Sequence, residues 1–388
     1  MNKIKFAIIG VGNMGTTHAK NLLEGKVENG ELACLCDISA ERREALKELF
    51  PNVPVFANVD EVIESGLADA LMVSVPHYDH VKIAVKGFEA GLNVLVEKPA
   101  AVYTNDVLHM NEVAKKSGKT FGLMFNQRTS PAYTKLREMI KSGELGRIKR
   151  VQWTITDWYR STSYHNSGAW RSTWATEGGG ALINQNPHQL DLMQWIFGMP
   201  SRIMSHLYFG KYRDLEVEDE ATLFWEYDDG MTVTYITSTA EAPGTNRLEV
   251  ACDMGRIIVE NNKIIFNKLG VSEPEFDRTH TGAFGAPAVA ETLELNEAIY
   301  GSGHAGIMQD FALACLENRQ PSLACGFEGI NEMTISNACH LSTWKGNVWV
   351  DVKNFPHDEF EKYLREKIAT SKPKTNVKAQ VADTKGTY

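Results

Sequence analysis

Residues 177–191 combine a glycine turn with polar side chains at helical spacing, in the run Glu-Gly-Gly-Gly-Ala-Leu-Ile-Asn-Gln-Asn-Pro-His-Gln-Leu-Asp. The apolar periodicity predicts a helix that extends to about Trp195 and carries Asn184, His188 and Asp191 on one face. Pro187 should kink or restart this helix. A buried polar group without a partner costs about 1–3 kcal/mol, so an inward polar stripe is unusual in a core helix. Two interpretations stay open: His188 is either a hydrogen-bonded core residue or a group that moves protons.

A second candidate site is a GxGxxG pattern that follows an expected strand, residues 3–9, and precedes an expected helix, residues 16–23. In this setting the first glycine makes a tight turn, the second lets the backbone approach a pyrophosphate, and the third lets the helix pack on the strand. The helix N-terminus adds N–H groups for the anion. The pattern therefore predicts a dinucleotide cofactor. Its residues are Gly10, Val11, Gly12, Asn13, Met14 and Gly15.

Asp37 follows the next expected strand, residues 31–36, and indicates which dinucleotide binds. A carboxylate at this position accepts hydrogen bonds from the adenosine ribose hydroxyls and repels a 2′-phosphate, which favours NAD over NADP. Arg42 and Arg43 follow closely, and an arginine there could meet a phosphate. We interpret them instead as solvated residues of an expected helix, residues 39–50.

Strand and helix patterns keep alternating as far as residue 125, which predicts a doubly wound parallel sheet with right-handed crossovers. We expect further helices at residues 58–64, 78–90 and 104–116, and further strands at 70–75, 93–96 and 120–125. Ligands of such sheets bind beyond the carboxyl ends of the strands. Besides the glycine pattern, the cofactor residues expected at this edge are Ser74, Pro76, His80, Glu97, Lys98, Asn126 and Gln127.

From about residue 148 the pattern changes to an expected strand, residues 149–157, and then to a loop rich in aromatic and polar residues. Aromatic faces beside polar groups suit a sugar, whose C–H faces are apolar and whose rims carry hydroxyls. Each of these aromatics could equally pack an interdomain core. The loop contains Trp158, Tyr159, Tyr164, His165, Trp170, Arg171 and Trp174.

Turn signals separate six later strand-like runs, which predict an α+β domain with an open, mainly antiparallel sheet. The runs are residues 202–209, 220–227, 232–239, 247–252, 255–259 and 263–267, and helices follow at 307–317, 327–345 and 358–368. One face of the sheet should pack on helices and the other could pair with a second subunit, so we expect a homo-oligomer, a dimer or a tetramer. The expected division is an NAD-binding domain, residues 1–125, a substrate-binding and oligomerisation domain, 126–368, and a disordered polar tail, 369–388.

Composition excludes several classes of protein. The 388 residues are 43% hydrophobic and 23% charged, as in ordinary globular proteins, and the formal net charge of -9 argues against nucleic-acid and anionic-membrane partners. No apolar stretch approaches the roughly 20 residues of a membrane span, and the N-terminus lacks a signal-peptide pattern. The six cysteines have neither a CxxC pair nor metal-ligand spacing, so we expect buried free thiols, a cytoplasmic location and no metal.

The chain resembles the Gfo/Idh/MocA family of sugar and polyol oxidoreductases over nearly all of its length to about residue 368. The resemblance implies a Rossmann domain, an α/β domain with an open antiparallel sheet, and an active site between them in which Lys98 and His188 carry the chemistry. Family members often hold an Asp four residues before that histidine, where this chain has Asn184. Asn can hydrogen-bond but cannot stabilise a charged imidazole as Asp does. The motifs are residues 7–12, Glu97-Lys98-Pro99, Gly178-Gly179-Gly180, His188, Asp191, Asp310-Phe311 and residues 318–321.

Oxidation of a secondary alcohol needs a base and a group that stabilises the developing alkoxide. We assign His188 as the base and Lys98 as the cation on the alcohol oxygen. The roles could be exchanged, because desolvation and a positive nicotinamide ring lower the pKa of Lys98. Glu97 is expected to anchor structure or cofactor rather than carry the proton.

Residues 157–160 and 184–188 look more similar to sugar and glycoside dehydrogenases of the family than to its inositol dehydrogenases. The first hypothesis is therefore oxidation of the C3 hydroxyl of a glucosyl unit, which gives a 3-keto sugar. The alternatives are a myo- or scyllo-inositol dehydrogenase and, in another class, a non-catalytic dinucleotide-binding sensor. Retention of Lys98 and His188 argues against the sensor. The expected substrate-binding residues are Lys98, Tyr159, Tyr164, His165, Asn184 and His188.

Overall fold

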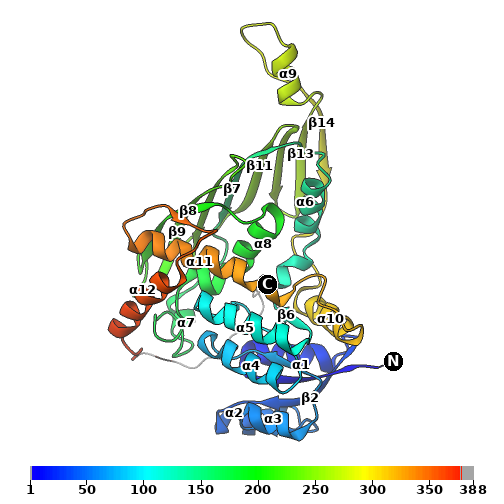
Figure 1. Ribbon diagram of the computed structural model, residues 1–388, viewed down its shortest axis with the longest axis vertical. Coiled ribbons are helices and arrows are strands. Elements are labelled where there is room, and N and C mark those ends of the chain that lie inside the picture. Colours follow the sequence, from blue (N-terminus) through cyan, green and yellow to red (C-terminus); the bar gives the residue numbers. More distant parts are fainter. Residues whose placement is uncertain (1, 376, 378–388) are drawn as a thin grey trace.

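The computed structural model describes residues 2–375 and 377 and contains two β-sheets with helices packed on them (Figure 1). The first sheet has six parallel strands in the spatial order β3-β2-β1-β4-β5-β6. Its strands are β1 (Ile4–Ile9), β2 (Gly30–Cys36), β3 (Val55–Phe56), β4 (Ala70–Val73), β5 (Asn93–Val96) and β6 (Phe121–Leu123). Its helices are α1 (Asn13–Leu23), α2 (Ala40–Leu49), α3 (Val59–Ser65), α4 (His80–Glu89) and α5 (Thr104–Ser117).

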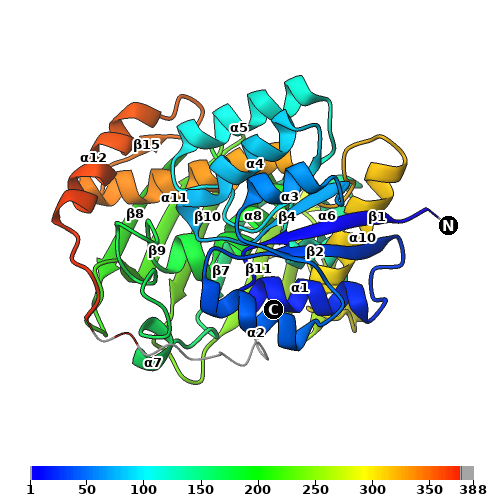
Figure 2. The ribbon, with the colours of Figure 1, turned by 90° about the horizontal axis from the view of Figure 1, so that it is seen from below.

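Helices cover both faces of this sheet: α4 and α5 lie on one side and α1 on the other (Figure 2). The central strands are correspondingly apolar and buried, since every residue of β4 is inaccessible to solvent. The predicted doubly wound parallel sheet is therefore confirmed. Only the short edge strand β3 was not expected.

The second sheet has nine strands in the order β14-β13-β12-β11-β7-β10-β9-β8-β15. Its strands are β7 (Ile148–Ile155), β8 (Arg202–Phe209), β9 (Glu218–Glu226), β10 (Thr232–Ser238), β11 (Asn246–Cys252), β12 (Gly255–Glu260), β13 (Lys263–Leu269), β14 (Val289–Leu295) and β15 (Val350–Asp351). The predicted meander is wrong at one point, because β7 lies between β11 and β10 and pairs parallel with β10. Parallel pairing needs a long connection, and the chain supplies one that carries several helical segments and the strands β8 and β9 before β10.

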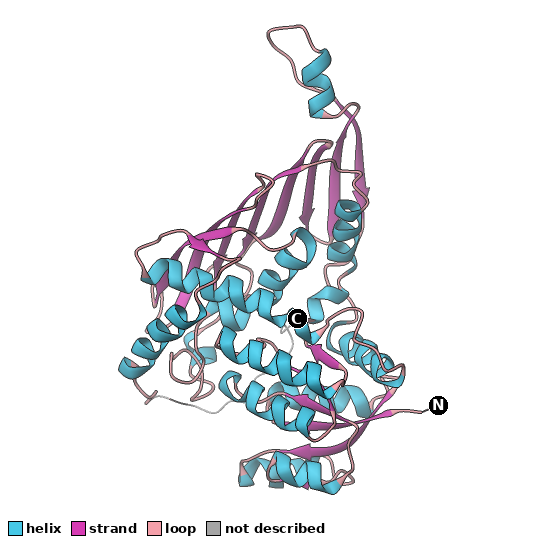
Figure 3. Cartoon of the chain, in the orientation of Figure 1, coloured by secondary structure: helices cyan, strands magenta, loops and turns pink. Residues whose placement is uncertain are grey.

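One face of the second sheet is covered by helices, which lie in front of the strands in Figure 3. The helices α11 (Gly329–Trp344) and α8 (Pro187–Phe197) pack on each other, and α11 packs on β8. Alternate residues of β8 to β11 are buried, as expected for a sheet with one covered face. The expected homo-oligomer through the other face stays a prediction.

Several elements were not predicted. Helix α6 (Pro131–Lys141) follows Ser130, whose hydroxyl caps it, and begins at Pro131, so the start signals were present in the sequence. Helix α9 (Glu273–Thr279) lies in an arm that projects beyond the sheet (Figure 1), and β14 follows it as the edge strand of the sheet. Helix α10 (Gly303–Leu316) was predicted at residues 307–317, and the structure adds that it packs against strands of the first sheet.

The C-terminal helix α12 (His357–Thr370) ends where the disordered tail was expected to begin. The described residues that follow are ordered on the body, since Ser371 donates a hydrogen bond to Glu216 and the Lys374 ammonium donates one to the carbonyl of His165. The disorder expected for residues 369–388 stays a prediction, and most of that tail lies outside the described residues. None of the helices found in residues 2–375 is long and apolar enough to span a bilayer. All six cysteines are free thiols, five of them buried and Cys325 half-buried.

Candidate active site

A cavity of about 850 Å³ opens beyond the carboxyl ends of β1, β2, β4 and β5 and reaches the second sheet's aromatic loop. The glycine turn forms part of its wall. Gly10 has a φ of +84°, and a Cβ there would meet the carbonyl oxygen of Ser74 at 2.8 Å. A Cβ on Gly15 would meet the carbonyl oxygen of Gly10 at 2.2 Å, so α1 can pack on the turn only because this residue is glycine. Gly12 lines the cavity with open space around it, which leaves its backbone accessible to a pyrophosphate.

Asp37 lies at the end of β2 with both carboxylate oxygens in the turn. One oxygen accepts the Val11 N–H at 3.0 Å and the other accepts the Ser39 N–H at 2.9 Å. Each oxygen keeps a lone pair for a ribose hydroxyl, and the residue lines the cavity. The Arg43 guanidinium donates hydrogen bonds to the backbone carbonyls of Asp37 and Ile38. We therefore interpret it as part of the local structure rather than as a phosphate ligand.

We expect the Asp37→Ser variant to raise the KM for NAD at least about tenfold, because two charge-assisted hydrogen bonds to the ribose are lost. Turnover with NADP should rise, since the carboxylate no longer repels a 2′-phosphate and Arg42 lines the same part of the cavity. Initial rates with both cofactors measure this. Glu44→Gln, a change on the exposed side of α2, is the control, and unchanged cofactor preference in Asp37→Ser would contradict the role given to this carboxylate.

Most of the expected cofactor residues border the cavity, but three do not. Gly15 is packed under the turn, the Asn126 amide lies 3.5 Å from a His304 ring nitrogen, and Gln127 accepts a hydrogen bond from Gln189. The last two do not line the cavity, because the chain turns after β6 into a short helix, Asn126–Thr129, that faces α8 and α10. Their role in cofactor binding stays a prediction. The expected residues that line the cavity are Gly10, Gly12, Asn13, Met14, Asp37, Ser74, Pro76, His80, Glu97, Lys98, Trp170 and Arg171.

Lys98 follows β5 and lines the cavity, where its ammonium donates a hydrogen bond of 2.7 Å to the carbonyl oxygen of Asn184. Burial lowers the pKa of Lys98 to about 8, and the neighbouring Glu97 carboxylate only partly opposes this. The guanidinium groups of Arg171 and Arg160 lower the pKa further. Lys98 is therefore poised to exchange a proton near neutral pH.

Glu97 has a structural role next to Lys98. One carboxylate oxygen lies 2.7 Å from His18 Nε2, and the other accepts the Lys98 N–H at 3.1 Å. Burial raises the pKa of Glu97, but the hydrogen bond from His18 and the charges around it outweigh burial and bring the pKa down to about 2. The carboxylate stays ionised and holds the turn that presents Lys98.

The polar residues 184–191 do not lie on one continuous α-helix. A π-helix, Ala181–Gln185, ends before Pro187, and α8 starts again at that proline, which is the restart predicted from the sequence. Asn184 and His188 line the cavity, whereas Asp191 is buried and holds the Arg128 guanidinium at 2.6 and 2.7 Å. Asp191 therefore does not join Asn184 and His188 at the cavity, because the buried Arg128 guanidinium binds its carboxylate one turn further along α8.

His188 lines the cavity with its Nδ1 atom buried and without a partner among the described residues. Burial and the nearby Lys98 charge lower its pKa well below the ordinary value of 6.5. The imidazole is neutral at physiological pH, and no carboxylate of residues 2–375 bonds to it to form an Asp–His pair.

A carboxyl group that sequence reasoning missed lies beside Asn184. Glu177 is buried, one of its oxygens accepts a short hydrogen bond from the Asn184 amide, and the other accepts the Ser172 N–H at 2.5 Å. Burial raises the pKa of Glu177 to about 7. Glu177 orients the side-chain amide of Asn184, and the backbone carbonyl of Asn184 accepts the hydrogen bond from Lys98. Its position directly before the three glycines was the available signal.

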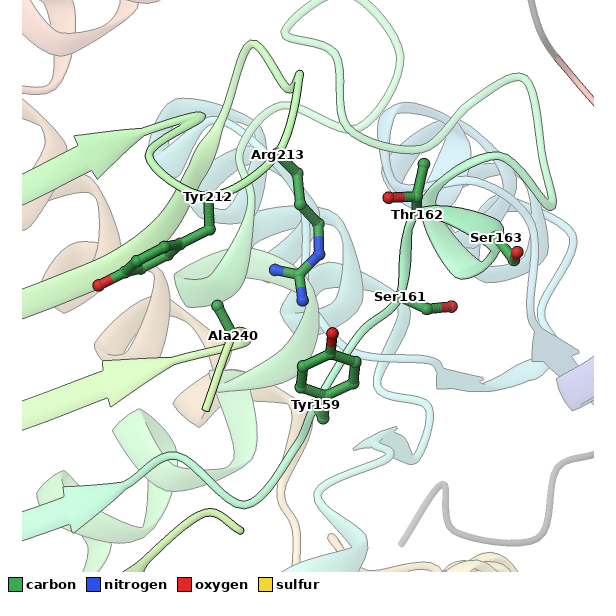
Figure 4. A pocket seen from close by; sticks show the side chains of 7 residues that line it. All are labelled: Tyr159, Ser161, Thr162, Ser163, Tyr212, Arg213 and Ala240. Atoms are coloured by element: carbon green, nitrogen blue, oxygen red, sulfur yellow. The ribbon is translucent and has the colours of Figure 1, made fainter. Parts of the chain in front are cut away.

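The aromatic loop contributes Trp158, Tyr164 and Trp170 to the cavity wall. Two expected substrate residues lie elsewhere. Tyr159 is half exposed and lines a separate cavity (Figure 4), because successive residues of an extended segment point to opposite sides. His165 is buried, with Nδ1 at 2.7 Å from the Ser172 hydroxyl, so it supports the loop rather than the cavity.

Three further residues of this region were not among the expected site residues. Arg160 and His304 line the cavity, and burial lowers the pKa of His304 to about 4. Glu332 on α11 is fully buried, and neither of its carboxylate oxygens has a hydrogen-bond partner in the described part of the chain. Burial raises its pKa well above the usual range, so Glu332 is uncharged. Only the packing of distant segments brings these residues together.

Comparison with known proteins agrees with this geometry. Residues 4–125 match the family described as "Oxidoreductase family, NAD-binding Rossmann fold", and residues 133–258 match the "GFO/IDH/MocA C-terminal domain". The scyllo-inositol 2-dehydrogenase (NAD(+)) of Bacillus subtilis is 25% identical over 266 residues, which cover 66% of this chain and 74% of that protein. The D-glucoside 3-dehydrogenase of Escherichia coli is 29% identical over 202 residues, 51% of this chain and 55% of that protein.

The fold has close counterparts among solved structures. Levoglucosan dehydrogenase, in a complex with NADH and levoglucosan, superposes with a TM-score of 0.74 at 19% identity and covers 90% of this chain and 100% of that chain. The glycine turn, the Asp37 carboxylate and the open backbone at Gly12 fit the cofactor named by the family model. The chain belongs to the Gfo/Idh/MocA family of NAD-dependent oxidoreductases.

Proposed function

We propose that this protein is a sugar dehydrogenase that oxidises a secondary hydroxyl, and that the hydroxyl is C3 of a glucosyl unit. The observation that carries the proposal is that Lys98 and His188 line one cavity together with the glycine turn and with aromatic side chains. When bound, NAD supplies the hydride acceptor. The aromatic faces of Trp158, Tyr164 and Trp170 suit the apolar faces of a sugar ring.

The pKa values support the exchanged roles for the two catalytic residues. A base works best when its pKa lies near the working pH, which favours Lys98, at about 8, over the much more acidic imidazolium of His188. In this assignment the neutral Lys98 amine takes the hydroxyl proton. The neutral His188 ring hydrogen-bonds the same oxygen and orients it, while the Asn184 carbonyl keeps the Lys98 side chain in place.

The remaining cofactor and substrate assignments are part of the same proposal. Trp170 and Arg171 border the cavity between the two sheets, where they can contact either the nicotinamide end of the cofactor or the sugar. Asn184 and Tyr164 complete the sugar site, joined by a hydrogen bond between the Asn184 amide and the Tyr164 hydroxyl at 3.4 Å.

Similarity to an inositol dehydrogenase supports the second candidate substrate, myo- or scyllo-inositol. A kinetic panel separates the candidates: NADH formation is measured with glucose, methyl glucoside and myo-inositol, and the position of the ketone is determined in the product. A 3-keto glucosyl product supports the first proposal. A keto-inositol with no reaction of the glucosyl compounds would replace it.

We expect the rate of alcohol oxidation to rise with pH towards about 8 and to level off above it. The base must be unprotonated, so kcat should fall about tenfold for each pH unit below the pKa of Lys98. The positive nicotinamide ring lowers that pKa further, which places the kinetic midpoint at or below about 8. Rates at saturating NAD and sugar measure the profile. A flat profile from pH 6.5 upwards would return the base to His188, whose pKa lies well below 6.5.

A further inference from the structure

A second cavity of about 440 Å³ lies next to the catalytic one, and we call it the Arg213 pocket (Figure 4). Figure 4 shows the guanidinium of Arg213 at its centre, between the side chains of Tyr159, Tyr212 and Ser161. The loop between β8 and β9 contributes Tyr212 and Arg213, and the aromatic loop contributes the rest of one wall. The lining residues are Tyr159, Ser161, Thr162, Ser163, Tyr212, Arg213 and Ala240.

The two cavities share one wall, the chain segment of residues 158–164. Trp158 and Arg160 face the catalytic cavity, whereas Tyr159 and Ser161 face the Arg213 pocket. The carbonyl of Thr239 joins the two sides, because it accepts the Arg160 backbone N–H at 2.9 Å and Arg213 Nη2 at 3.1 Å. This single segment therefore separates the two cavities.

Arg213 has no carboxylate partner of its own among the described residues, whereas the neighbouring Lys211 and Tyr212 are bonded to Asp219 and Glu220. Its guanidinium carbon lies 5.0 Å from the centre of the Tyr159 ring, and its side chain makes no ion pair with any carboxylate of the described residues. Its Nη1 atom is buried and without a hydrogen-bond partner in the same part of the chain. A buried, unpartnered guanidinium nitrogen is costly unless a ligand completes it.

Other cations lie around the same wall. Arg160 and Arg171 both lie over the Tyr164 ring, at 5.0 and 4.4 Å, and the Lys374 ammonium bonds the His165 carbonyl. Burial lowers the pKa of His165 to about 3, and the positive charges of Arg213, Lys374, Arg171 and Arg160 add to the effect. Glu177 offsets part of this charge, but its carboxyl is already hydrogen-bonded to Asn184 and Ser172. The wall is thus cationic in a chain whose net charge is -9.

We propose that the Arg213 pocket is a subsite for an anionic group, a carboxylate or a phosphate, carried by the sugar that is oxidised beside Lys98. The guanidinium attracts such a group by its charge, and hydroxyls on the facing wall can donate to its oxygens. Because Nη2 already donates to the Thr239 carbonyl and Nη1 is buried, a contact through both nitrogens requires the Arg213 side chain to reorient. Tyr159 and Tyr212 flank the part of the substrate that bears the charge. This inference rests on the proposed sugar dehydrogenase function and adds the class of substrate.

The test compares ligand affinities in the NADH-loaded protein by calorimetry, which needs no turnover. The probes are methyl glucoside, methyl glucuronide and glucose 1-phosphate, with wild type, Arg213→Gln and the control Arg278→Gln on the exposed arm. We expect wild type to bind at least one charged sugar about tenfold or more tightly than methyl glucoside, an advantage that Arg213→Gln loses and Arg278→Gln retains. The two charged probes tell a carboxylate from a phosphate.

Equal affinity of wild type for charged and neutral sugars, or an advantage that survives Arg213→Gln, would overturn the subsite. Turnover measured on the same three sugars separates this failure from that of the proposed function. Oxidation of methyl glucoside without any effect of charge keeps the dehydrogenase and removes the subsite. Tight binding that depends on Arg213, without oxidation of any sugar, keeps the anion-binding pocket and removes the dehydrogenase assignment.

Discussion

The Lys98→Met variant should lose about 10³-fold or more in kcat while its affinity for NADH stays within about threefold of wild type. Methionine fills a similar volume but has no amine, so it can neither take the hydroxyl proton nor stabilise an alkoxide. The bound cofactor depends instead on the glycine turn and on Asp37, which this change does not touch. Stopped-flow hydride transfer and NADH fluorescence titration measure the two quantities.

Lys82→Met is the matched control, because Lys82 is an exposed lysine on α4 whose ammonium pairs with Asp79. It should change neither quantity. Loss of NADH binding in Lys98→Met would show that the amine holds the cofactor rather than the alcohol. If the residual activity of Lys98→Met still rose with pH up to about 8, the titrating group would be a residue other than Lys98.

The His188→Asn variant should lose about 10²-fold in kcat and keep the limb of the pH profile that belongs to Lys98. The imidazole lines the cavity as a neutral ring, so its loss removes one hydrogen bond to the reacting oxygen without removing the base. Asparagine can still hydrogen-bond but cannot reach the same oxygen. Steady-state rates between about pH 6 and about pH 10 measure both effects.

His206→Asn is the control, since this histidine is stacked on Tyr208 on the second sheet, away from the cavity. If kcat of His188→Asn fell and no longer rose with pH, the histidine would be the base. No turnover of any sugar or polyol by wild type, with tight NADH binding, would favour the sensor hypothesis over both assignments.

Much of the first half of the molecule could be predicted from the chain alone, because parallel strands buried on both faces produce short apolar runs with clear boundaries. The glycine pattern, Asp37 and Lys98 lie within two or three residues of strand ends, so local sequence places them at the correct edge. Asn126 and Gln127 were placed by the same reasoning, but they do not line the cavity. Their strand, β6, ends early, and a short helix turns both residues towards α8 and α10.

The second half depends on contacts between segments far apart in the chain. The parallel pairing of β7 with β10 joins residues about eighty positions apart, and no local periodicity encodes it. The polar residues 184–191 separate for a similar reason, since Asn184 and His188 line the cavity whereas Arg128, 63 positions earlier in the chain, binds Asp191. Sequence spacing alone assumes a regular helix, and the tertiary packing did not provide one.

The sequence by itself determined the fold class, the dinucleotide and the two residues proposed to react, because each is encoded within a few positions of a strand or a glycine turn. Only the tertiary structure decided which charges surround those residues. Glu177 beside Asn184, the shift in the pKa of Lys98 and the unpaired Arg213 all arise from burial and from contacts between distant segments. Burial and through-space charge depend on the whole folded molecule, and no stretch of sequence carries them alone.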